Sequence, residues 1–286
     1  MHPLDAVKSL VDFNFYRTVP RRSYGEASLY LAMLSLIFAT AMIFALMFQV
    51  VPQIRTTLNW ARDSFPTMTL TEGTLTSDAK GPVVVRHPEL KHVSIVVDTN
   101  RVEPVTVEEL QENGALAILT RNKVYIAKLR PILESRSKES VPGFAIDGVE
   151  THILDTYAKD ESLILDSDFY DNISRKLPLV LYPVAFIFTF GFFFIWKHGA
   201  AVVYSLMGLL INGFQTGRLE FPALYRIAVF VQTPVVILQI AALFIPEPIR
   251  LFGLITLIVV GVYLWKAIAI VNADLPEPPE PSPLPE

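Results

Sequence analysis

The sequence predicts an α-helical integral membrane protein with four to five transmembrane helices and an inserted extracytoplasmic α+β domain. Two observations lead to this fold class. Hydrophobic residues make up 52% of the 286 residues and charged residues only 18%, with a mean hydropathy of +0.42, whereas an average soluble domain carries roughly 25% charged residues. The apolar residues also gather in residues 27–51 and 177–271, and most charged residues lie between these two regions.

The composition excludes several classes of function. The formal net charge is −4, from 24 basic and 28 acidic residues, which argues against a basic nucleic-acid binder. The chain contains no cysteine, so disulfides and cysteine-ligated metal centres are excluded. We therefore expect the lipid bilayer, and no nucleic acid, among its partners.

Residues 1–26 are predicted to form a cytoplasmic amphipathic segment at the level of the lipid headgroups, with a disordered tail as the alternative. The basic residues Arg17, Arg21 and Arg22 are expected at the interface and, by the positive-inside rule, indicate a cytoplasmic N-terminus. The helical pattern is an interleaving of apolar and charged positions: Val7, Leu10, Val11, Phe13 and Phe15 with Lys8, Asp12 and Arg17.

Residues 27–51 are predicted to form the first transmembrane helix, because they can cross a hydrocarbon core of about 30 Å. This block is too long for a cleavable signal peptide, and the following VPQIRTTLNW offers no small-residue cleavage site. The sequence therefore predicts a signal anchor, which places residues 52–176 outside the cytoplasm.

The C-terminal apolar region is predicted to form a membrane helix bundle over residues 177–196, 200–215, 222–245 and 251–271. A single helix from Leu177 to Gly213 would be about 55 Å long, so a break at Lys197-His198-Gly199 is favoured. Pro246-Glu247-Pro248 separates the last two helices. Five crossings with an outside C-terminus result, although four crossings with one long bent helix and an inside C-terminus stay open. Residues 272–286 are predicted to be a disordered tail rich in proline and glutamate.

Residues 52–176 are predicted to fold as an α+β domain, since they hold 15 basic and 19 acidic residues and short strand patterns. Strands are expected at 83–85, 92–97, 115–119 and 123–128, the last two joined as a hairpin. Thr106 is expected to cap a helix over 107–111 that ends at Asn113-Gly114. We predict one antiparallel sheet with a few covering helices, and a helix over 169–177 that leads into the membrane.

The sequence contains no recognised catalytic, nucleotide-binding or metal-binding motif, so we expect neither an enzyme nor a cofactor. Its densest acidic cluster is Asp166, Asp168 and Asp171 in LDSDFYDN. This spacing is compatible with a calcium ion, but the glycine and the closing glutamate of a calcium loop are missing. A solvated, capped helix start is therefore the favoured interpretation, and an envelope enzyme using these carboxylates is a third alternative.

Polar residues within the apolar helices are candidates for function, because such groups are costly inside a bilayer. Arg226 and Lys266 lie near helix ends and can extend to the interface. Gln232-Thr233-Pro234 predicts a helix kink at Pro234, with polar side chains satisfying the freed carbonyl. No acidic residue lies within the helix cores, which argues against a proton-coupled carrier. The full set of candidates is Arg226, Gln232, Gln239, Asn212 and Lys266.

Three stretches resemble a bacterial membrane-protein family known as domain of unknown function 1189. They are KSLVDFNFYRTVPRRSYGEASLYLAMLSLI, then LTEGTLTSDAKGPVVV with IVVDTNRVEPVTVEEL and AILTRNKVYIAK, and finally RLEFPALYRIAVFVQTP. The last stretch is also distantly similar to the Yip-type proteins of vesicle trafficking. The resemblance implies a multi-pass protein of the bacterial cytoplasmic (inner) membrane. Some relatives carry a label linking them to maltodextrin utilisation, and the family supplies no catalytic residues.

These observations predict a non-enzymatic inner-membrane accessory or scaffold protein. Its extracytoplasmic domain and helix faces are expected to bind a membrane or envelope partner, or a second copy of the chain. The alternative is a transporter or transport-coupled subunit, with a sugar-related substrate as one option, that uses the polar residues within the helices.

Overall fold

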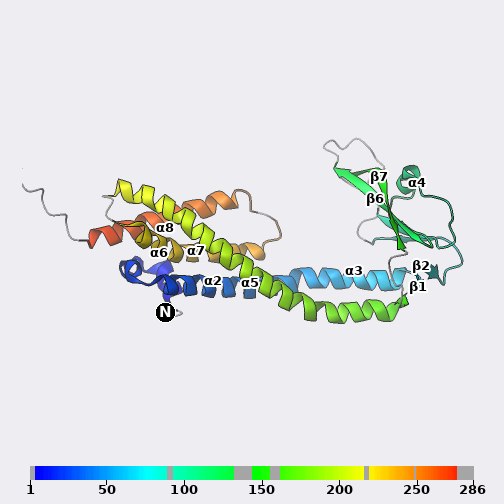
Figure 1. Ribbon diagram of the computed structural model, residues 1–286, viewed down its shortest axis with the longest axis horizontal. Coiled ribbons are helices and arrows are strands. Elements are labelled where there is room, and N and C mark those ends of the chain that lie inside the picture. Colours follow the sequence, from blue (N-terminus) through cyan, green and yellow to red (C-terminus); the bar gives the residue numbers. More distant parts are fainter. Residues whose placement is uncertain are drawn as a thin grey trace, which may run out of the picture. The chain divides into compact units, whose positions relative to one another are not determined.

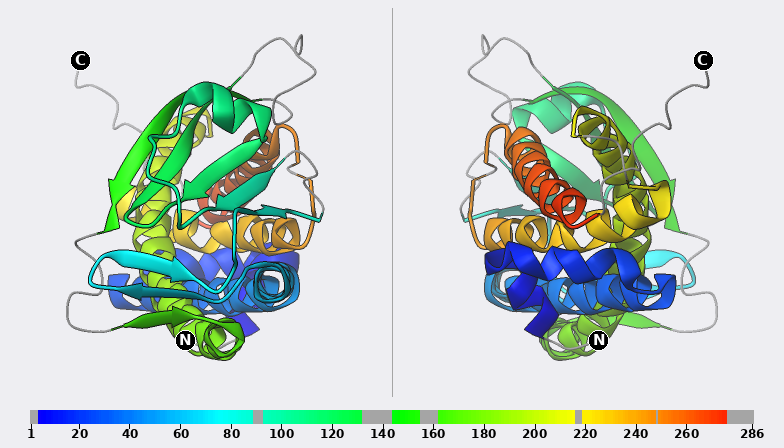
Figure 2. Two further views of the ribbon diagram at one scale, coloured as in Figure 1. Left: turned by 90° about the vertical axis from the view of Figure 1, so that its right-hand side faces the viewer. Right: turned by 90° about the vertical axis from the view of Figure 1, so that its left-hand side faces the viewer.

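The computed structural model describes residues 4–88, 93–131, 144–154, 162–215, 219–247 and 249–275. The chain divides into two compact units (Figure 1). Figure 2 shows the same ribbon from two further sides. The membrane unit comprises Met1–Val50 and Val180–Glu286, and the α/β unit comprises Val51–Leu179. Most of the predicted tail, residues 276–286, lies outside the described residues.

The described residues contain four helices long and apolar enough to cross a membrane, which is compatible with a multi-pass membrane protein. This number is the lower of the two that the sequence left open. The first runs from Tyr24 to Ser64 through α2 (Tyr24–Ala45), the π-helical η2 (Leu46–Val50) and α3 (Val51–Ser64); the others are α5 (Ser167–Phe214), α6 with α7 (Phe221–Phe230 and Gln232–Leu243) and α8 (Phe252–Ala273).

The predicted break at Lys197-His198-Gly199 is wrong, because α5 runs through these residues without interruption. Its buried residues recur every three or four positions, which places them on one side of the helix. Lys197 belongs to this buried stripe, so it faces the bundle and does not mark a turn at the membrane surface. The stripe consists of Phe193, Lys197, Ala201, Ser205, Gly208 and Asn212.

The third span is interrupted in its middle, where α6 ends at Phe230 and α7 begins at Gln232. Pro234 has no N–H group, and its ring would clash with the carbonyl of Phe230 in a continuous helix. The hydroxyl of Thr233 donates to this carbonyl over 2.9 Å. A polar side chain next to the proline thus satisfies the backbone group that the proline leaves free.

The N-terminal segment folds as α1 (Leu4–Val11) and the 3₁₀-helix η1 (Phe13–Arg21), and η1 packs against α6 and α8. In α1 the polar Asp5 and Ser9 are buried, whereas Val7 and Val11 are exposed. Partners within the membrane unit, Arg22 for Asp5 and Thr233 for Ser9, explain why these polar groups are buried. In η1 the apolar residues Phe15, Tyr16 and Val19 are buried.

The α/β unit contains two sheets and not the single antiparallel sheet that the sequence predicted. A three-stranded antiparallel sheet has the order β2-β1-β8, and a five-stranded sheet has the order β3-β4-β5-β6-β7. Within the latter, β4 and β5 are parallel because α4 crosses between them. The elements are β1 (Met68–Thr71), β2 (Thr74–Ser77), β3 (Val83–Arg86), β4 (Ser94–Val97), α4 (Val107–Glu112), β5 (Ala115–Leu119), β6 (Lys123–Pro131), β7 (Phe144–Ile153) and β8 (Leu163–Leu165).

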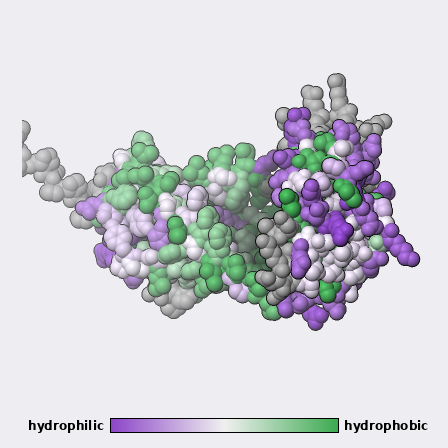
Figure 3. Space-filling model, turned by 45° about the vertical axis from the view of Figure 1, so that its right-hand side comes forward, coloured by the Kyte–Doolittle hydropathy of each residue, from purple (hydrophilic) through white to green (hydrophobic). Residues whose placement is uncertain are grey.

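Local sequence signals explain the connections in this unit. The β1–β2 turn has positive φ at both central residues, Glu72 (48°) and Gly73 (74°), which matches the twist of a hairpin. The predicted hairpin of β5 and β6 is present, with Leu119 opposite Val124. One hydrophobic core lies between α4 and the five-stranded sheet, and a second joins both sheets. On the visible face, hydrophobic residues are more frequent in the membrane unit and strongly hydrophilic residues more frequent in the α/β unit (Figure 3).

A bidentate ion pair fixes the start of α4. Arg101 donates through Nη2 to Oε2 of Glu109 over 2.7 Å and through Nη1 to Oε1. The Arg101 guanidinium lowers the pKa of Glu109 below its usual value. The pair therefore stabilises the folded state at neutral pH, and this contribution is lost as the pH falls through the lowered pKa.

We expect Glu109→Gln to increase hydrogen exchange in α4 and β5 of the full-length protein at pH 7. The difference from the wild type should shrink as the pH falls below about 4.3, the ordinary value for a glutamate. Hydrogen-exchange mass spectrometry at matched pH measures both effects. Glu108→Gln, at an exposed neighbouring position, is the control. An equal effect of the two substitutions would contradict this role of the ion pair.

Candidate functional site

The membrane unit buries a set of polar side chains among its apolar helices. Because the hydrocarbon core supplies no water, each such group needs a partner within the protein. These groups are therefore candidates for a functional site. They are Asp5, Ser9, Ser35, Lys197, Ser205, Asn212, Gln232, Thr233 and Asn272.

Lys197 is the basic residue of this set, and only 1% of its surface is exposed. Its Nζ donates to Oε1 of Gln239 over 2.9 Å and lies 4.8 Å from the centre of the Phe193 ring. Gln232 donates from Nε2 to the carbonyl of Lys197 over 3.1 Å. Two glutamines of α7 thus hold one lysine of α5, and we call this group the Lys197 cluster (Phe193, Lys197, Gln232 and Gln239).

The Lys197 cluster retains one unused acceptor. Gln232 is completely buried, and its Oε1 has no hydrogen-bond partner among the residues that the structure describes. The next residue of α5, His198, lies 3.2 Å from the hydroxyl of Ser28 through Nε2 and 2.9 Å from the carbonyl of Phe194 through Nδ1. His198 thereby links α5 to α2, as Lys197 links α5 to α7.

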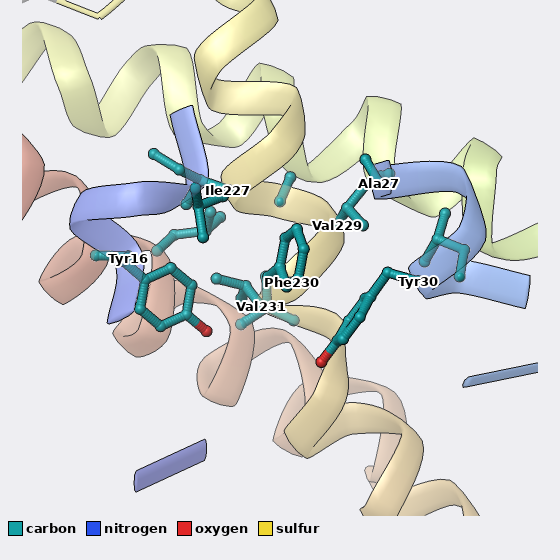
Figure 4. Packing of buried hydrophobic residues seen from close by; sticks show 14 of the residues in the cluster. Tyr16, Ala27, Tyr30, Ile227, Val229, Phe230 and Val231 are labelled. Atoms are coloured by element: carbon teal, nitrogen blue, oxygen red, sulfur yellow. The ribbon is translucent and has the colours of Figure 1, made fainter. Parts of the chain in front are cut away.

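A network of hydroxyl groups lies where α1 meets α2 and α7. Ser9 donates to Oγ1 of Thr233 over 2.9 Å and lies 3.0 Å from the hydroxyl of Tyr30, which also contacts Thr233. Tyr16 donates to the carbonyl of Ser9 over 3.0 Å, and burial raises the pKa of Tyr16 well above its usual value. Figure 4 shows Phe230 flanked by Tyr16 and Tyr30. The network explains why α1 turns Ser9 toward the bundle.

A buried ion pair fixes the N-terminal segment beside this network. Nη1 of Arg22 lies 2.7 Å from Oδ2 of Asp5, and their side chains are 17% and 7% exposed. The Arg22 guanidinium also lies 5.0 Å from the ring centres of Phe15 and Phe230. Arg22 is therefore part of the packed structure and not a free interfacial charge. Of the other two predicted interfacial residues, Arg17 pairs with Asp274 at 3.2 Å and Arg21 is exposed.

The two predicted polar candidates near helix ends, Arg226 and Lys266, also contact other parts of the chain. Arg226 donates from Nη1 to the carbonyl of Pro20 and lies 4.8 Å from the ring centre of Tyr24. Lys266 is exposed, with its ammonium 5.1 Å from the ring centre of Phe13. Both basic residues thus contact the N-terminal segment.

Asn212 forms a separate polar group at the end of α5. Its side chain donates to the carbonyl of Leu219 over 2.9 Å and accepts from Nδ2 of Asn272 over 3.1 Å. Asn272 also donates to the carbonyl of Gln215 over 3.2 Å. Asn212 and Asn272 therefore fasten the end of α8 to the end of α5, and this group lacks the charged residue of the Lys197 cluster.

Two of the three residues in the acidic cluster of the α/β unit, Asp166 and Asp171, have a structural role. Asp166 accepts through Oδ1 from the N–H of Phe169 over 2.9 Å, which caps the start of α5. Asp171 pairs with Arg62 at 3.0 Å, and Asp168 lies in the first turn of α5. Among the described residues, no group of three or more histidine, cysteine, aspartate or glutamate side chains is placed to hold a metal ion.

The comparison with known families gives one match. The family model "Protein of unknown function (DUF1189)" matches residues 5–268. The chain belongs to this family. No curated protein and no solved structure matches the chain. The match includes residues of both units, and the family is of unknown function.

We expect substitutions of Gln239 and of Lys197 to change the free energy of unfolding by different amounts. Gln239→Leu leaves the buried ammonium without its acceptor, and we expect a loss of about 2 kcal/mol in the free energy of unfolding. Lys197→Met removes the ammonium itself, and we expect the double variant Lys197→Met/Gln239→Leu to be more stable than Gln239→Leu alone. Thermal unfolding of the full-length protein in detergent measures the order.

Gln53→Leu is the matched control, because Gln53 is exposed in α3. A double variant less stable than Gln239→Leu would show that the two side chains do not act as a pair.

Proposed function

We propose that this DUF1189 protein is a non-enzymatic accessory or scaffold protein of the bacterial cytoplasmic membrane. Its membrane helices would bind a second membrane protein and hold the α/β unit beside that partner. The observation that carries the proposal is an apolar stretch of α5, residues 177–192, in which the described part of the chain buries no residue.

Helix α5 buries far less of itself than the other spans do. In its most apolar stretch 6% of the residues are buried, compared with 33%, 56% and 28% in the first, third and fourth spans. None of the residues 177–192 is buried. The exposed face carries stacked aromatic rings, with Phe188 and Phe192 at 6.1 Å and Phe192 and Trp196 at 6.4 Å between centres. Aromatic residues are enriched at the centres of protein interfaces.

The contacts of the polar candidates favour a scaffold over a transporter. Gln239, Arg226 and Asn212 each bind another part of the same chain. A transport pathway instead needs polar groups that line a cavity. The observation that favours the transport alternative is the Lys197 cluster, which contains a buried cation and also an amide oxygen, Oε1 of Gln232, with no hydrogen-bond partner among the described residues.

We further propose that the N-terminal segment is cytoplasmic and that the α/β unit is extracytoplasmic. The basic residues Lys8, Arg17 and Arg21 precede the first span, and such residues are concentrated on the cytoplasmic side. With four crossings, the end of α8 returns to the side of the N-terminus. The ion pair of Arg17 with Asp274, which follows α8, agrees with this arrangement.

A photo-crosslinker on α5 tests the proposed partner binding. We expect benzoyl-phenylalanine in place of Phe188, which is 71% exposed, to give one discrete protein adduct in native membranes. The same group in place of Ile258, which is 58% exposed on α8, is the control and should react with lipid. Mass spectrometry of the adduct identifies the partner.

Lipid adducts alone at both positions would contradict the proposal. An adduct of the chain with itself would also contradict it and would show a homo-oligomer. If uptake of a solute were lost in Lys197→Met while protein abundance and the Phe188 adduct were unchanged, transport would become the better account.

A further inference from the structure

A pocket of about 700 Å³ opens in the N-terminal part of the membrane unit. It is lined by residues of α1, η1 and the start of α2. Its charged lining has three carboxylates and three cations, so it is neutral overall and carries both signs within one cavity. These residues are Asp5, Lys8, Asp12, Arg21, Arg22 and Glu26.

The two exposed cations of the pocket are free to bind a ligand. Asp5 and Arg22 neutralise each other in the buried ion pair described above. Lys8 and Arg21 are exposed, and neither forms an ion pair with any residue that the structure describes. A phosphate group bound between Lys8 and Arg21 would form charge-assisted hydrogen bonds with both.

The remaining carboxylates fit a positively charged group. Asp12 accepts through Oδ1 from the N–H of Asn14 over 3.0 Å, and Glu26 accepts through Oε2 from the N–H of Ser23 over 2.8 Å. Each carboxylate uses one oxygen in these backbone contacts, which leaves its other oxygen to accept from an ammonium group. A ligand with one phosphate and one amine therefore matches the neutral lining better than an anion does.

The outer surface of α1 indicates that this ligand is a lipid. Leu4, Val7 and Val11 are 53%, 54% and 76% exposed, and their spacing of three and four residues places them on one face of the helix. Lys8 and Asp5 occupy the neighbouring face, at the same spacing. The helix thus presents an apolar stripe for an acyl chain directly beside the charged pocket.

We propose that the pocket binds the headgroup of a zwitterionic phospholipid that carries a phosphate and a primary amine, as in phosphatidylethanolamine. Lys8 and Arg21 bind the phosphate, and Asp12 and Glu26 bind the ammonium. Basic pockets between membrane helices bind the anionic headgroups of cardiolipin and phosphoinositides, whereas the carboxylates in this pocket favour a zwitterionic headgroup. The inference is independent of the partner proposed above, because it concerns a different part of the membrane unit.

Native mass spectrometry of the full-length protein in mild detergent tests the site with three added lipids: phosphatidylethanolamine, phosphatidylcholine and phosphatidylglycerol. We expect phosphatidylethanolamine to bind most tightly. The double variant Lys8→Gln/Arg21→Gln should bind it about tenfold more weakly or worse, since two charge-assisted hydrogen bonds are lost. The double variant Arg55→Gln/Arg250→Gln, which removes two exposed cations elsewhere in the chain, is the matched control and should bind as the wild type does.

Three outcomes would overturn the inference. Equal binding of phosphatidylglycerol would reject a zwitterionic ligand, and equal weakening by both double variants would reject the pocket. Complete displacement of the lipid by free phosphoethanolamine would assign the site to a soluble molecule. Retention of bound phosphatidylethanolamine in excess phosphoethanolamine is the expected result.

Discussion

No water is available inside a bilayer to complete the hydrogen bonds of a buried polar group, and this constraint determines how the membrane unit is built. Lys197 shows its effect most clearly, because a buried ammonium has to find an acceptor on a neighbouring helix. Gln239 supplies that acceptor, and Gln232 binds the backbone of the same residue. The hydroxyl network of Ser9, Tyr30 and Thr233 serves the N-terminal segment in the same way. Polar side chains therefore specify which helices meet, while apolar residues fill the space between them.

The same constraint explains which features could be predicted from the sequence. Apolar stretches and short strand patterns are local, so α4 and the β5–β6 hairpin lie where the sequence places them, and the predicted apolar regions contain the candidate membrane helices, although not with the predicted bounds. The continuity of α5 could not be predicted in this way, because the partner of Lys197 lies 42 residues further along the chain. The burial of Ser9 in α1 depends likewise on Thr233, and the parallel pairing of β4 with β5 depends on the path of the chain through α4. For α5, the available signal in the sequence was Lys197, an isolated lysine in an apolar stretch too long for one crossing.

The two surfaces proposed for binding differ in the same physical terms. Residues 177–192 of α5 are apolar and aromatic, so only lipid or another membrane protein can cover them. The N-terminal pocket is charged, and its exposed cations Lys8 and Arg21 lie beside the apolar stripe of α1. A protein with these two surfaces and with its inner polar groups bound to one another is suited to holding other molecules in place. These two surfaces support the proposal that the DUF1189 chain is an anchored binding protein.

The central claim is that α5 crosses the membrane once, with Lys197 held inside the bundle. Gly199 offers a direct test, because the position of a Cβ atom there lies in open space and the chain contains no other cysteine. A water-soluble maleimide should leave the Gly199→Cys variant unmodified in native membranes and should modify it after denaturation. The Glu247→Cys variant, between α7 and α8, should react without denaturation. Rapid modification of Gly199→Cys in intact membranes would place this residue at a membrane surface and would contradict the account.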